Sequence, residues 1–145
     1  MHLSFIILAG VLGVASATIV QDCGSTAELK EVSISNCGTP PCVLKRGEDI
    51  IVDINFDNNV ATETLTTKVT GTIGGIEIPW LGVVSDACTS LIEGDCPLEA
   101  GEEVKYSAKA PVLNEYPAVI VIVTWKLKDH DGKTTVCFVV PAQIV

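Results

Sequence analysis

The sequence predicts an all-β fold, a sandwich of two antiparallel sheets. Its 145 residues contain several short runs in which apolar and polar side chains alternate, and no apolar pattern with a helical period. Glycine and proline separate these runs, as turns between strands require. Six cysteines provide the crosslinks that are typical of small extracellular domains. A chain of this length is expected to form one domain with a substantial core.

The strongest strand signal is the run 118–127, which we expect to be a central strand. Its residues are mostly β-branched, a composition that favours strands. They alternate between an unbroken apolar row and a row that becomes polar from Thr124 onward. The turn sequence at 129–132 then predicts an antiparallel hairpin with a second apolar run, 134–140.

Five further strands are expected from alternation. The clearest is 50–57, in which the apolar side chains point one way while Asp53, Asn55 and Asp57 point the other. This pattern indicates a sheet with one buried and one solvated face. About seven antiparallel strands with disulfide crosslinks fit an immunoglobulin-like β-sandwich. The other four expected strands are 28–35, 65–73, 76–80 and 104–112.

Metal and enzyme chemistry have little support in this sequence. Asp53, Asn55 and Asp57 resemble the opening of a calcium loop, but Asn58 stands where that loop needs glycine and Thr64 where it needs glutamate. His130 lies in the predicted turn between two aspartates, with no nucleophile nearby. No catalytic motif occurs, so we expect no enzymatic activity, no metal site and no cofactor.

Residues 1–17 have the pattern of a signal peptide. They are apolar almost throughout and end in Ala15-Ser16-Ala17, the small-x-small pattern that signal peptidase cuts. The apolar run is too short to span a bilayer. We therefore expect a mature domain at 18–145 and no membrane span.

Charge and sequence motifs narrow the range of partners. The formal net charge is -9, which argues against nucleic acid and against anionic membrane surfaces as partners. No Asn-x-Ser/Thr sequence occurs, so no N-linked glycan is expected.

The six cysteines all lie in the expected mature chain, which a signal peptide sends through an oxidising compartment. Four of them form two pairs that each bracket a turn-forming loop, so these are natural local partners. The two that remain lie near the ends of the mature chain, where a bond would tie the first strand to the last. The expected disulfides are Cys37–Cys42, Cys88–Cys96 and Cys23–Cys137.

Two of the expected strands carry small residues on the face that should point inward. Ala108 and Ala110 follow one another on one such face, and Gly71 lies on another. A packed sandwich normally has bulky side chains there, so the pattern indicates space between the sheets. The candidate lining residues on these faces and on the central strand are Tyr106, Ala108, Ala110, Val121 and Val123.

Several segments together resemble the ML-domain (lipid-recognition) family, which includes soluble Niemann-Pick type C sterol-transfer proteins and group 2 mite allergens. The similarity covers the whole mature chain, and this sequence is closest in character to the arthropod members. The segments that carry the resemblance are Asp22-Cys23-Gly24-Ser25, Ile78-Pro79-Trp80, the stretch 111–117, Trp125-x-Leu127-x-Asp129 and the tail 137–145.

The resemblance implies a lipid cavity between the two sheets and the three disulfides given above. It implies a secreted carrier that binds and transfers a sterol or another small apolar lipid, such as a fatty acid or a semiochemical. In the family a sterol is gripped by an aromatic residue after a proline, a valine after a proline and a tyrosine before a proline. The matching residues here are Trp80, Val112 and Tyr116, and the family more often has phenylalanine at the first position.

Localisation and partners also follow from the resemblance. Family members reach lysosomes through a phosphorylated N-glycan, so the missing acceptor favours secretion into the extracellular fluid. A membrane lipid-transport receptor is a candidate partner, and a monomer is the default state. The alternative is a closed sandwich for protein recognition, in which Trp80, Val112 and Tyr116 are ordinary core residues.

Overall fold

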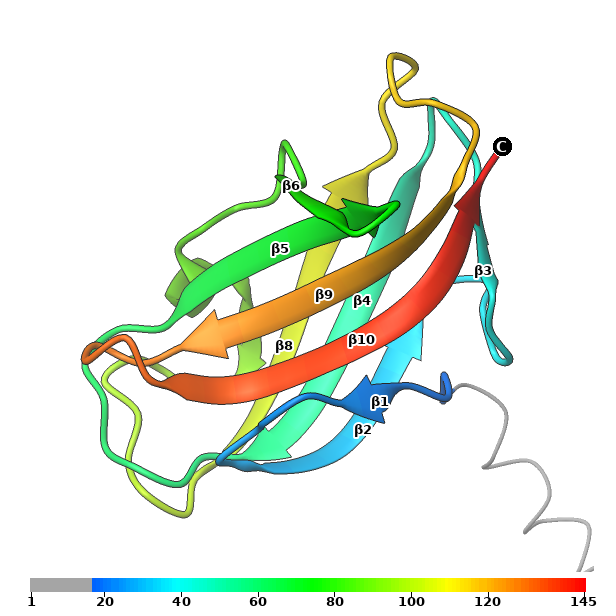
Figure 1. Ribbon diagram of the computed structural model, residues 1–145. Helices are drawn as coiled ribbons and strands as arrows, with labels where there is room; N and C mark the ends of the chain where they lie inside the picture. The colour runs from blue at the N-terminus through cyan, green and yellow to red at the C-terminus, as the bar shows by residue number, and fades with distance from the viewer. Residues whose placement is uncertain (1–16) are drawn as a thin grey trace, which may run out of the picture.

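The computed structural model describes residues 17–145, so the predicted signal peptide lies outside the described residues except for Ala17. The described chain forms two sheets packed face to face, and the strands of one cross those of the other at an angle (Figure 1). This is the predicted all-β sandwich. The only helical segment in this part of the chain is one 3₁₀ turn, η1 (Ala87–Ser90).

The first sheet has six strands and the second has four. In spatial order the first contains β1 (Gln21–Asp22), β10 (Thr134–Ile144), β9 (Ile120–Lys128), β5 (Thr66–Ile73) and β6 (Ile76–Pro79), with β3 (Cys42–Leu44) also beside β10. The second contains β2 (Glu28–Ile34), β4 (Asp49–Asp57), β8 (Glu103–Pro111) and β7 (Leu91–Glu93).

Strand β9 is central, as the sequence predicts. It pairs antiparallel with β10 on one side and with β5 on the other. Its odd-numbered residues from Val121 to Leu127 are buried, while Ile120 and Ile122 are exposed on the outer face. Strand β4 shows the same alternation, with Val52, Ile54 and Phe56 buried between the sheets.

Strand β10 is longer than the predicted run 134–140, because it continues through Pro141 to Ile144. Proline cannot donate to a strand ladder. On the side away from β9, β1 reaches only as far as Val139 and β3 begins opposite Ala142. Pro141 lies between these two pairings. No neighbouring strand on that side is therefore left without a hydrogen bond because Pro141 lacks a backbone N–H. The pairing of β10 with β3 is parallel, an exception to the antiparallel pattern.

Aromatic rings pack in the middle of the space between the sheets. The rings of Trp125 and Phe138 are cross-strand partners on β9 and β10, and they stack with centroids 6.5 Å apart. Tyr106 of the opposite sheet meets the Trp125 ring edge-on at 6.3 Å. All three side chains are fully buried. This layer forms a packed floor between the sheets.

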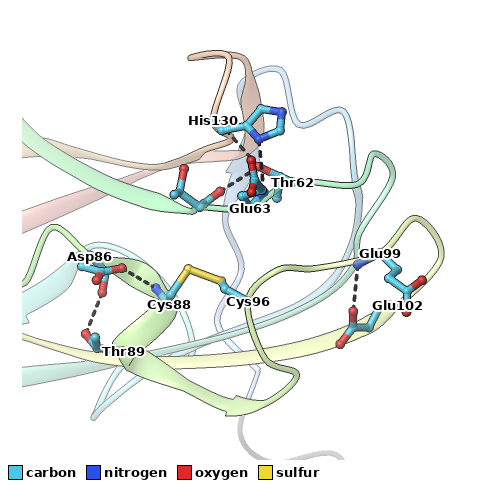
Figure 2. The surroundings of a disulfide bond; sticks show 10 residues. Thr62, Glu63, Asp86, Cys88, Thr89, Cys96, Glu99, Glu102 and His130 are labelled. Carbon is cyan, nitrogen blue, oxygen red and sulfur yellow. Dashed lines mark hydrogen bonds between the residues drawn. A yellow bond between two sulfur atoms is a disulfide. The ribbon is translucent and has the colours of Figure 1, made fainter.

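The structure contains the three disulfides that loop chemistry and resemblance favoured. Cys37–Cys42 and Cys88–Cys96 close local loops, and Cys23–Cys137 joins the start of the described chain to β10. The Cys88–Cys96 loop begins at η1, where the Asp86 side chain accepts a hydrogen bond from the Cys88 backbone N–H (Figure 2). An acidic cap of this kind satisfies a backbone donor that the short helix leaves free.

Candidate functional site

An apolar cavity of about 130 Å³ lies at one end of the sandwich. Its walls come from β5, β6, β9 and β10 and from the loop that joins β8 to β9. That loop and the C-terminal end of β10 lie at the same end of the molecule (Figure 1). We call this end of the sandwich, where the cavity lies, the mouth.

Three of the predicted site residues line this cavity. They are Trp80, which follows β6, Tyr116 in the loop before β9, and Val121 on β9. Val123, two residues further along β9, instead borders a void of about 10 Å³ deeper in the sandwich. The central strand therefore leads from the mouth toward the floor.

The other predicted lining residues lie in the packed core. Tyr106, Ala108, Ala110 and Val112 all come from the chain at β8 and its end, and each is buried without bordering the cavity. Val112 is only 1% exposed, and its N–H and C=O pair with the backbone at Glu48 and Gly47. Contact of these residues with a ligand requires a wider space between the sheets and stays a prediction.

Trp80 connects the two sheets at the mouth. Its indole N–H donates a hydrogen bond of 2.8 Å to the carbonyl oxygen of Pro111, the last residue of β8. Its ring meets the Tyr116 ring edge-on, with centroids 5.1 Å apart. The side chain is 9% exposed, so a large apolar ring closes most of this side of the cavity.

Two more contacts hold the segment after Trp80 against the end of β8 and the loop that follows it. The backbone N–H of Leu81 donates to the Tyr116 hydroxyl at 3.1 Å. Gly82 lies so close to the Pro111 ring that a Cβ atom there would be 2.6 Å from Pro111 Cγ. Gly82 also has a φ of +85°, a backbone conformation that favours glycine. The close contact and the backbone conformation therefore each require glycine at this position.

Gly71 on β5 makes room for the Trp80 ring. A Cβ atom at this position would lie 2.9 Å from Val121 Cγ2 and 3.5 Å from Trp80 Cε3. The missing side chain therefore leaves a recess in the cavity wall, and the indole lies over it. Sequence reasoning identified Gly71 as an inward-facing gap, and the structure shows which side chain lies against it.

Sequence reasoning missed Ile73, Ile78 and Ile144, which also line the cavity. Each occupies the last or nearly the last position of its strand, so alternation alone could place it on a face but not at the mouth. The signal that could have found two of them is the Gly74-Gly75 turn, because a tight hairpin places Ile73 opposite Ile76 and brings Ile78 opposite Gly71.

A second polar contact between the sheets lies at the floor. The hydroxyls of Thr67 on β5 and Tyr106 on β8 share a hydrogen bond of 3.0 Å. Burial raises the pKa of the Tyr106 hydroxyl above its usual value, although its hydrogen bond with Thr67 opposes the rise. Tyr106 therefore stays neutral at physiological pH. The deep end of the sandwich offers neutral hydroxyls and aromatic rings.

His130 lies in the turn between β9 and β10 (Figure 2). That turn is at the end of the molecule away from the loop that joins β8 to β9 (Figure 1). Its Nδ1 accepts a hydrogen bond from the Glu63 backbone N–H, and its own backbone N–H donates to the Thr62 hydroxyl. The side chain therefore fastens one loop to another. Within residues 17–145, no three His, Cys, Asp or Glu side chains are grouped in a way that could hold a metal ion.

Comparison with known proteins gives a consistent result. The family model described as ML domain matches residues 17–144. A Bos taurus protein named NPC intracellular cholesterol transporter 2 is 37% identical over 86% of this chain and 83% of its own length. A Drosophila melanogaster protein, NPC intracellular cholesterol transporter 2 homolog a, is 38% identical over 94% of this chain and 93% of its own length.

A solved structure has the same fold. The crystal structure of a Niemann-Pick type C2 protein from Japanese carpenter ant superposes with a TM-score of 0.77 at 24% identity. The match covers 88% of this chain and 99% of the ant chain, so it includes both sheets of the sandwich. In the described residues no helix is long and apolar enough to cross a membrane. With its six cysteines, its two-sheet architecture and these relatives, the chain belongs to the ML-domain family.

Proposed function

We propose that this protein is a secreted carrier that binds a sterol or another small apolar lipid between its two sheets and transfers it. The observation that supports this most directly is the apolar cavity at the mouth, bordered by Trp80 and Tyr116. Ligand pockets in proteins are concave and mostly apolar, with a few polar groups that orient the ligand. Among the described residues that line the cavity, the only polar side-chain groups are the Trp80 indole N–H and the Tyr116 hydroxyl.

The class of ligand follows from this chemistry and from the relatives. No lining side chain carries a charge, so binding rests on burial of apolar surface. A lipid that loses about 500 Å² of apolar surface to the protein gains about 12 kcal/mol before association costs, which is consistent with micromolar to nanomolar binding. The names of the bovine and fly relatives state cholesterol transport. A sterol is therefore the first ligand to test, and a fatty acid the second.

The proposal extends to place and partners. The signal-peptide pattern of 1–17 supports export, with 18–145 as the mature domain. The absence of an N-glycosylation sequence supports an extracellular rather than a lysosomal destination. We further propose that the protein is a monomer and that it passes its lipid to a membrane lipid-transport receptor. Binding and release of a lipid at the mouth require no enzymatic step.

Extraction of the purified secreted protein with organic solvent, followed by mass spectrometry, tests the proposal. A carrier is expected to yield a sterol or fatty acid in near-stoichiometric amount, and the stripped protein is expected to bind added cholesterol or oleic acid. A protein-recognition module yields no such lipid and binds neither. The second result would leave Trp80, Val112 and Tyr116 as core residues only.

A further inference from the structure

The outer face of the six-stranded sheet carries a cluster of three lysines. Lys68 on β5 and Lys126 on β9 are directly opposite each other, and Lys128 follows two residues further along β9. Lys68 is exposed, and Lys126 and Lys128 are half-buried. Their neighbours Trp125 and Leu127 are buried in the core, so the lysines point to the outer face. In Figure 1 this face is turned toward the viewer.

The lysine cluster has no neutralising partner within the chain. Directly opposite residues of an antiparallel pair have Cβ atoms about 5 Å apart, a distance at which like charges destabilise the sheet. None of the three ammonium groups forms an ion pair within residues 17–145. On the opposite sheet, by contrast, Lys30 lies 3.1 Å from Asp57 and Lys105 lies 3.4 Å from Glu93. The unpaired cluster therefore indicates an anionic partner outside the chain.

Hydroxyl groups surround the cluster. Thr66 on β5 and Thr134 on β10 are the cross-strand neighbours of Lys128, and Thr124 precedes Lys126 on the same face of β9. Protein partners are usually anchored by buried aromatic or apolar side chains, and these positions offer none. The surface therefore suits a partner that is held by charge and hydrogen bonds alone.

The acidic character of the whole chain does not cancel the cluster. The formal net charge is -9, but charges further apart than about 8 Å are largely screened at physiological ionic strength. The next acidic residue along the chain is Asp129, whose carboxylate accepts the backbone N–H groups of Asp131 and Lys133 within the turn. An anion that approaches the outer face of β9 therefore meets a locally positive surface.

The kind of cation indicates the kind of anion. Arginine is the side chain that recognises carboxylate and phosphate through paired hydrogen bonds, and the cluster contains none. Lysine presents a compact point charge on a flexible stem. A row of such charges with hydroxyl neighbours suits sulfate groups that recur along a sugar chain.

We propose that Lys68, Lys126 and Lys128 form a binding surface for a sulfated polysaccharide, which retains the secreted protein at a cell surface or in an extracellular matrix. The ammonium groups contact sulfates on successive sugars, and the threonine hydroxyls donate to sugar or sulfate oxygens. The cluster lies toward the β9–β10 turn, at the end of the molecule away from the loop that joins β8 to β9 (Figure 1). Attachment there leaves the mouth free. This inference goes beyond lipid carriage and depends only on the proposed export.

Titration of the purified protein with a heparin hexasaccharide tests the proposal. Binding is expected at low salt, and an increase from about 50 mM to about 200 mM salt should weaken it about thirtyfold, as counterion release from about three contacts requires. Poly-glutamate, unsulfated hyaluronan and vesicles of phosphatidylcholine with phosphatidylserine serve as comparison ligands. Each is expected to bind more weakly than the heparin hexasaccharide.

Two double variants of equal net charge form a matched pair. Lys68→Gln with Lys126→Gln removes two of the three contacts, so heparin binding should weaken at least about tenfold and lose only about threefold more between the two salt concentrations. Lys30→Gln with Lys105→Gln makes the same change in net charge on the opposite sheet and should leave binding unchanged. The first variant also removes a repulsion, so its melting temperature is expected to rise by about 1 to 2 °C. Its loss of binding then does not come from unfolding.

The possible outcomes are distinct. Absence of heparin binding at low salt overturns the proposal. Equal weakening in the two double variants also overturns it, because net charge rather than the cluster would then set the affinity. If poly-glutamate or the vesicles bind as tightly as heparin, the surface serves an acidic polypeptide or a membrane and the polysaccharide is refuted. The carrier function is tested separately by lipid extraction, and neither result decides the other.

Discussion

The hydroxyl oxygens of Thr67 and Tyr106 lie 3.0 Å apart and form a hydrogen bond between the two sheets inside the core. Residue Thr67 belongs to β5 and Tyr106 to β8, so the bond ties the sheets together at the end opposite the mouth. A polar contact therefore helps to set the distance between the sheets near the floor. At the mouth, the contact between the sheets is made by Trp80 and its neighbours.

The raised pKa of Tyr106 predicts a loss of stability in alkali. Burial favours the neutral hydroxyl, so the folded protein retains a proton that the unfolded chain releases near its usual pKa of about 10. The free energy of unfolding should therefore fall as the pH rises above that value. Tyr106→Phe is expected to reduce this alkaline loss and to lower stability at neutral pH by about 1 kcal/mol, because Thr67 loses its partner. Urea unfolding of wild type and Tyr106→Phe at neutral and alkaline pH measures both effects. If the two proteins lose the same free energy of unfolding in alkali, Tyr106 is not the cause of the loss.

The long disulfide should contribute most to stability. The Cα atoms of Cys23 and Cys137 lie 5.0 Å apart although 114 residues separate them in sequence. In the entropic model, closing so long a loop stabilises the fold by about 4 to 5 kcal/mol, and closing the short Cys37–Cys42 loop by about 2 kcal/mol. Double alanine variants of each pair, compared by urea denaturation, test this order. A larger loss for the short loop would mean that native-state contacts outweigh loop closure.

Val121 and Val112 form a matched pair for testing the cavity. Both are 1% exposed, but only Val121 borders the cavity. Val121→Phe is expected to fold with little loss of stability, because the added ring enters existing space, and to lose most cholesterol binding. Val112→Phe adds the same volume to packed core and should cost about 1 to 3 kcal/mol. Melting temperatures and cholesterol titrations of the two lipid-stripped variants test this difference. Equal destabilisation of the two variants would mean that the cavity cannot accommodate the added ring.

The ring and the hydroxyl of Tyr116 have separable roles. Tyr116→Phe retains the wall and removes only the acceptor for the Leu81 N–H, so we expect near-normal lipid affinity. Tyr116→Ser removes the ring, and the lost apolar contact should weaken binding by about 2 kcal/mol, roughly thirtyfold. Equilibrium titration with a fluorescent sterol measures both. Equal affinity of the two variants would show that the ring does not touch the ligand.

The strands were predictable because their alternation is local. Strands β4, β8 and β9 lie within two residues of the expected bounds, since each presents an apolar row to the core. Strand β3 was not predicted. It has only three residues, and its parallel partner on β10 is about a hundred residues away in sequence. Alternation along 65–73 places Thr70 on the outer face of its sheet, yet Thr70 is buried, and Glu77 of the next strand accepts a hydrogen bond from its hydroxyl.

The mouth was only partly predictable for a similar reason. Resemblance pointed to Trp80 and Tyr116, and alternation pointed to Val121. Nothing local in sequence connects Trp80 to Pro111, which is 31 residues further along. Inward-facing residues such as Ala108 and Ala110 could be assigned to a face, but whether they meet empty space depends on what the opposite sheet places against them, and here the core closes over both.

The rings of Trp125, Phe138 and Tyr106 pack between the sheets and do not border the apolar cavity beside Trp80, so they close its inner side. Under the proposed carrier function, a lipid held in this cavity would leave by the opening through which it entered, so loading and unloading would be the same movement in reverse. Donor and acceptor membranes would then bind the same surface of the protein, one after the other. Such a carrier would have to dissociate from the first membrane before it could bind the second.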